Sequence, residues 1–66
     1  MNLTTLLHQI NTSQITLDEI PQARQQLEEE IFQCDEVIKD QETEWHMRNE
    51  YRETRRKCLA ALERIK

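Results

Sequence analysis

The sequence predicts an all-α protein, and three observations support this fold class. The chain has 66 residues with no glycine and one proline, Pro21, whereas folds made of strands and tight turns need glycine where the backbone takes a positive φ. Apolar residues recur at spacings of three and four, which is the period of a helix. Hydrophobic residues make up 36% and charged residues 33%, a balance typical of solvated helices with one apolar stripe. We therefore expect a single helical domain, 1–66, with a small core.

The N-terminal segment is expected to form a short amphipathic helix over residues 2–11, followed by a turn over 12–16. Asn2 is a suitable N-cap, and the polar run after Ile10 provides a stop. The apolar positions of this helix are Leu3, Leu6, Leu7 and Ile10. About ten residues are too few for a stable isolated helix in water, so this segment must dock on the rest of the chain or on a partner.

The second helix has a well-marked start. Thr16 and Glu19 have the spacing of a capping box, in which each residue satisfies a free backbone N–H of the first turn. Pro21 removes a hydrogen-bond donor and crowds the preceding turn. We therefore expect a tight or kinked first turn and a regular helix from about Pro21.

Two apolar stripes follow, and they are out of phase. The first has heptad-like spacing and predicts an oligomer seam, which consists of Ile20, Leu27, Ile31, Cys34 and Ile38. The second runs through Met47, Tyr51, Cys58, Leu62 and Ile65. At about 100° per residue the stripes point a third of a turn or more apart. A single straight seam cannot bury both of them.

The charges are divided between the two halves of the long segment. Residues 18–44 contain ten acidic and two basic residues, a net charge of −8, whereas residues 45–66 contain seven basic and three acidic residues, a net charge of +4. Flanking charges of this kind select the orientation of paired helices. Antiparallel pairing places acid against base, so we expect antiparallel coiled-coil association.

Two architectures satisfy this rule. In the first, which the absence of any helix breaker favours slightly, one long helix over about 17–66 pairs with a second copy. In the second, the chain turns near 39–43, Thr43 caps the second arm, and an intramolecular helical hairpin results. The hairpin would explain the change of stripe phase.

A partner-binding surface is expected on the C-terminal segment, because aromatic residues and arginine are enriched among the energetic anchors of protein interfaces. The residues concerned are Trp45, Met47, Arg48, Tyr51, Arg52, Arg55, Cys58, Leu62 and Ile65. An equally strong interpretation is that Trp45 and Tyr51 are ordinary seam residues of the protein's own helical bundle. The two interpretations coincide if the partner is a second copy.

Other kinds of site receive little support. The run from Arg55 to Lys57 suggests nucleic-acid binding, but the chain has a net charge of −4, and nucleic-acid-binding domains are usually basic. The two cysteines and two histidines lack the close ligand pairs of a zinc site. No nucleophile has a base near it in the sequence, and no glycine-rich phosphate loop is present. We expect no enzyme activity, no cofactor and no bound metal.

The location and class of the protein follow from the same features. The sequence has no apolar run long enough to span a membrane and no secretion signal, and two cysteines are too few for a secreted disulfide framework, so a cytoplasmic protein is expected. We expect a small interaction module, an adaptor, regulator or inhibitor, that forms a homo-oligomer or binds a partner protein. The alternatives are a nucleic-acid-associated regulator that uses its C-terminal Arg/Lys cluster and a structural subunit of a larger assembly.

Overall fold

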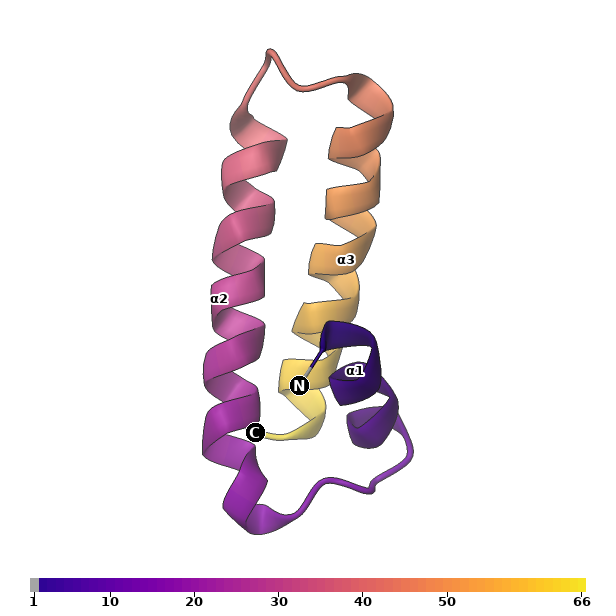
Figure 1. Cartoon of the computed structure of the whole chain (residues 1–66), viewed down its shortest axis with the longest axis vertical. Helices are drawn as coiled ribbons and strands as arrows, with labels where there is room; N and C mark the ends of the chain where they lie inside the picture. The colour runs from indigo at the N-terminus through magenta and orange to yellow at the C-terminus, as the bar shows by residue number, and fades with distance from the viewer. Residues whose placement is uncertain (1) are drawn as a thin grey trace.

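The structure, a computed structural model, describes residues 2–66, and all regular elements in that range are helical (Figure 1). In order they are α1 (Leu3–Asn11), the short 3-10 helix η1 (Leu17–Glu19), α2 (Ile20–Lys39) and α3 (Trp45–Arg64). The molecule is elongated and measures 40 × 19 × 17 Å. The predicted all-α class is confirmed.

Helix α1 covers Leu3–Asn11, close to the expected range of 2–11, and Asn2 is its N-cap as expected. The Asn2 side chain accepts a hydrogen bond from the Thr5 backbone N–H at 2.9 Å, which satisfies one of the free donors of the first turn. The helix ends at Asn11, and Ser13 then takes a left-handed conformation with φ 59°. A serine carries out here a chain reversal for which glycine is the usual residue.

The predicted capping box forms at the entrance to α2. The Thr16 backbone N–H donates to Glu19 Oε1 at 3.3 Å, and the Thr16 hydroxyl donates to the same oxygen at 2.8 Å. The first turn is tight, as expected, because it is the 3-10 helix η1. Pro21 lies in the first turn of α2, where a missing N–H costs little.

The favoured expectation of one continuous helix over 17–66 is wrong. Helix α2 ends at Lys39, Asp40 is extended with ψ 107°, and α3 begins at Trp45. The Asp40 carboxylate accepts from the Glu42 N–H at 3.0 Å, and the Asp40 carbonyl accepts from the Thr43 N–H at 3.2 Å. The hairpin alternative describes this break, but Thr43 does not cap the second arm, because Glu44 occupies the N-cap position of α3.

The break follows from the change in stripe phase. Helices α2 and α3 pack side by side and run in opposite directions (Figure 1). Folding back lets the stripe of α3 face that of α2, which a straight helix cannot do. Aspartate serves the turn without glycine because its carboxylate hydrogen-bonds to the backbone two residues ahead.

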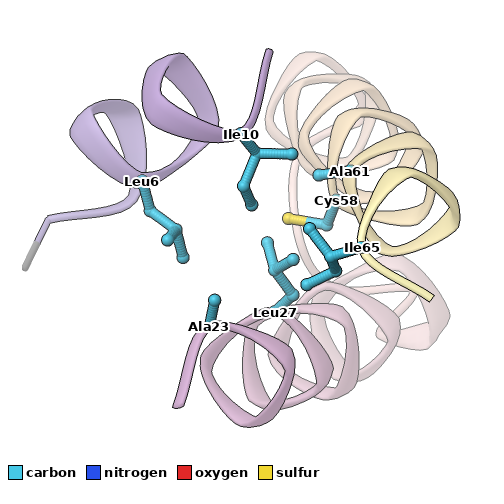
Figure 2. Packing of buried hydrophobic residues seen from close by; sticks show 7 residues of the cluster. All are labelled: Leu6, Ile10, Ala23, Leu27, Cys58, Ala61 and Ile65. Atoms are coloured by element: carbon cyan, nitrogen blue, oxygen red, sulfur yellow. The ribbon is translucent and has the colours of Figure 1, made fainter. Parts of the chain in front are cut away.

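All three α-helices contribute to the core, which lies at the end of the hairpin away from the turn. Side chains from each helix converge on a common centre (Figure 2). The buried cluster consists of Leu6, Ile10, Ala23, Leu27, Cys58, Ala61 and Ile65. Helix α1 lies beside the C-terminal half of α3 (Figure 1), so it covers one side of the hairpin at this end. The other side of the hairpin has no such covering within residues 2–66.

A distance measurement in solution distinguishes the hairpin from a continuous helix. We expect genetically encoded spin labels at Arg24 and Lys57 to lie well under 40 Å apart, since 40 Å is the longest dimension of the molecule. In a straight helix the same positions would lie about 50 Å apart at 1.5 Å per residue. Pulsed electron–electron double resonance measures the distance between the two labels. A dominant distance near 50 Å would contradict the hairpin.

Candidate protein-interaction surface

The residues of the predicted oligomer seam lie largely within the chain itself. Leu27 and Cys34 have no exposed surface, while Ile20 and Ile31 are partly buried against the core cluster. Ile38 is also partly buried, and it lines a shallow depression on the hairpin surface. The seam of α2 is therefore occupied first by α3 of the same molecule.

The predicted partner-binding stripe is divided by the fold. Cys58 and Ile65 are buried in the core, so a partner would reach them only if the hairpin opened. Leu62 packs partly against the core, and Arg48, Tyr51 and Arg55 are also partly buried. The exposed members are Trp45, Met47 and Arg52.

The side of the hairpin away from α1 forms a continuous surface, which we call the open face. Leu6 of α1 shares a depression with Ala23 and Gln26 of α2, which identifies the covered side. At about 100° per residue, the side chains that point the opposite way form the open face. Its apolar members are Ile20, Ile31, Ile38, Leu59 and Leu62, and its charged members are Arg24, Glu28, Asp35, Arg48, Arg52 and Arg55.

The electrostatics of the open face differ from those of the whole chain. Four arginines against two carboxylates give this face a net charge of +2, whereas the chain carries −4. Arg55 is the one arginine of the face with an ion-pair partner in residues 2–66: its Nε donates to Asp35 Oδ1 at 2.7 Å. Arg52 donates to the neutral Asn49 side chain at 2.9 Å. Arg48 Nε is buried without a hydrogen-bond partner.

Sequence reasoning missed two of the most exposed apolar side chains. Phe32 is 65% exposed on α2 and Leu17 is 85% exposed on η1. Phe32 lies outside the heptad positions, and Leu17 lies before Ile20, where the expected seam begins. The available signal for Phe32 was a large aromatic residue between Glu29 and Glu36, on the face of α2 opposite the seam.

The basic run at the centre of α3 does not form one surface. Successive residues of a helix point about 100° apart, so Arg55, Arg56 and Lys57 face three directions. Arg55 is paired with Asp35, and Arg56 is paired with Glu53. Arg56 and Lys57 line a depression of about 490 Å³ between α1 and α3.

The two cysteines are buried and unreactive in character. Both are free thiols with no exposed surface. Burial raises the pKa of the Cys58 thiol to about 11, with smaller contributions from Cys34 and Glu30. Burial also raises the pKa of the Cys34 thiol. A neutral, buried thiol packs as a small hydrophobic group and is a poor nucleophile.

The raised pKa of Cys58 predicts a loss of stability at alkaline pH. The unfolded thiol ionises near pH 9 and the folded thiol near pH 11, so between these values the unfolded state binds fewer protons and is favoured. Two pKa units correspond to at most about 2.7 kcal/mol. The stabilisation is complete below pH 9 and is lost as the pH rises to 11. Urea titrations at several pH values measure the free energy of unfolding. Between pH 9 and 11 it should decline more steeply with pH for the native chain than for Cys58→Ala, which serves as the control for lysine and tyrosine titration.

Metal-ligand and membrane-spanning features are also absent from the described range. Between residues 2 and 66, no three His, Cys, Asp or Glu side chains are grouped so that they could hold a metal ion. None of the helices in this range combines the length and the hydrophobicity that crossing a bilayer requires.

Comparison with known proteins gave no match to a family model, to a curated protein sequence or to a solved structure. The interpretation of the surface therefore depends on its own geometry.

Proposed function

We propose that this chain is a small, non-catalytic protein–protein interaction module, an adaptor, regulator or inhibitor that acts by helix-to-helix association with itself or with a partner protein. Its mechanism is occupancy: the hairpin binds a helical surface of its target and so presents or blocks it. The two free thiols are consistent with action in a reducing compartment such as the cytoplasm.

The observation that carries this proposal is the exposure of large apolar side chains on a small scaffold. Trp45 is 69% exposed at the start of α3 and Phe32 is 65% exposed on α2. Tryptophan is among the residues that most often dominate binding energy at protein interfaces. A helical surface that leaves such side chains in water is stabilised when a second surface covers them.

The test is purification of the native complex under mild conditions, followed by measurement of its mass. We expect a mass above that of the 8.0 kDa monomer. Trp45→Ala should weaken the association by at least about tenfold, since interface tryptophans cost 2 kcal/mol or more when truncated. The exposed polar residue Gln22, changed to alanine, is the control. A monomer with no co-purifying protein would contradict the proposal.

A further inference from the structure

The open face provides the basis for a more specific inference. We infer that it is the docking site for an acidic amphipathic helix of a partner protein. This inference rests on the proposed function, and it specifies which surface of the hairpin binds and what chemistry the occupant has.

The shape of the open face suits a helix. An apolar strip follows the line where α2 and α3 meet, and it contains the partly buried Ile20, Ile31, Ile38 and Leu62. From Ile20 to Ile38 this strip is about 27 Å long at 1.5 Å per residue. A partner helix of about 18 residues would cover it, with its apolar side chains against the strip on either side of the Asp35–Arg55 ion pair. Together with α2 and α3, that helix would form a layered helical packing of the usual kind.

The charges of the open face specify the occupant further. Arg24, Arg48 and Arg52 form no ion pair within residues 2–66, and they lie beside the apolar strip. Arg24 lies near the start of α2, while Arg48 and Arg52 lie near the hairpin turn, so cationic groups stand toward both ends of the strip. Carboxylates that flank the apolar stripe of a partner helix would pair with these arginines. Interfacial charge complementarity of this kind selects the partner and sets its orientation.

The depression at the Asp35–Arg55 ion pair could bind one side chain of the partner helix. It has a volume of about 380 Å³ and is lined by Asp35, Ile38, Arg52 and Arg55. It therefore offers one apolar contact beside two guanidinium groups. An apolar side chain of the partner fits between these groups, and an adjacent carboxylate can accept hydrogen bonds from Arg52.

A second copy of this chain is a poorer occupant. If two open faces met about a two-fold axis, two surfaces of net charge +2 would be brought together, and like charges across an interface oppose association. The acidic outer side of α2 around Phe32 could meet the open face of another copy. That contact is head-to-tail, however, and a head-to-tail contact that does not close produces open-ended filaments.

Site-specific photo-crosslinking in the cells that make the protein tests where the partner binds. A photoreactive phenylalanine derivative replaces Leu59, which is 39% exposed on the open face, or Phe32, which is 65% exposed on the outer side of α2. We expect the photoreactive residue at position 59 to form an adduct with another protein. The crosslinked segment of that protein should be predicted to form an acidic amphipathic helix. An adduct with a second copy, or with a basic or non-helical segment, would overturn the inference. Adducts from Phe32 alone would overturn the open face as the site but leave the proposed function intact, whereas no adduct from either position would count against both.

Charge reversal tests the electrostatic part with a defined probe. The probe is a fluorescent 18-residue helical peptide with a leucine stripe flanked by glutamates, and its counterpart has lysines in place of the glutamates. We expect the Arg24→Glu/Arg52→Glu variant to bind the acidic peptide at least about tenfold more weakly, because two attractive contacts become repulsive. The matched control, Lys57→Glu/Arg64→Glu, has the same net charge but changes residues off the open face, and it should bind as the native chain does. Equal weakening by both variants, equal binding of both peptides, or no binding of the acidic peptide would overturn the inference.

Discussion

Leu27→Ala should unfold a large fraction of the protein. Leu27 has no exposed surface and lies at the centre of the core, between α1 and α3 (Figure 2). Truncation of a fully buried leucine costs about 2–5 kcal/mol, since it removes apolar surface that folding had taken out of water and leaves a cavity in the core. A domain of this size has a total stability of roughly 3–10 kcal/mol, so one substitution removes much of it.

The measurement is thermal unfolding followed by circular dichroism at 222 nm. We expect the midpoint of Leu27→Ala to fall by more than about 10 °C, since each kcal/mol shifts the midpoint of a small domain by about 4–8 °C. Leu17→Ala is the matched control, because Leu17 is 85% exposed, and it should change the stability by less than about 0.5 kcal/mol. Similar effects of the two substitutions would show that the core is not centred where the structure places it.

The second large effect is expected from Leu6→Asp, which should detach α1 from the hairpin. Leu6 is 2% exposed and is one of two α1 side chains in the buried cluster, together with Ile10. A carboxylate at this position would be buried without an ion-pair partner, and burial of an unpaired charge costs several kcal/mol. A helix of nine residues cannot persist in water after it detaches. We expect α1 to unfold and the free energy of unfolding to fall by about 3–5 kcal/mol.

Amide hydrogen exchange reports this effect residue by residue. In Leu6→Asp the amides of α1 should lose nearly all their protection, and those at the turn end of α2 and α3 should keep more of theirs. Thr5→Asp is the control, because Thr5 is exposed on the same helix and an acidic residue in the first turn is favourable. If α1 remained protected in Leu6→Asp, the docking of α1 through Leu6 would be wrong.

Much of the local structure could be predicted from the sequence, because it depends on interactions between near neighbours. The Asn2 cap, the Thr16–Glu19 capping box and the tight turn before Pro21 each involve residues within a few positions of one another. The all-α class also followed directly, from the absence of glycine and the helical spacing of apolar residues.

The turn at Asp40 shows where this reasoning failed. No glycine or proline marks it, and the stretch from Lys39 to Glu44 has acceptable helix formers. Propensity therefore favoured a continuous helix by a small margin. Burial of two stripes that point in different directions is a larger effect, and it depends on contacts between residues far apart in the chain, such as Leu27 of α2 and Cys58 of α3, which share one buried cluster.

The exposure of the residues proposed for binding was predicted only in part for the same reason. The sequence identified Trp45, Arg48 and Arg52 as binding candidates, but it grouped them with Cys58 and Ile65, which the fold buries. Helical spacing shows which residues share a stripe. It does not show which stripe is already covered by the same chain.

The sequence by itself determined that this protein is made of helices, where the first two begin, and that its charges are segregated, since each of these depends on local spacing. Only the tertiary structure decided that the second stripe folds back onto the first and that α1 covers just one side of the hairpin. The physical reason is that burial of apolar surface is not directional and is settled by the whole set of available contacts, which local spacing does not specify.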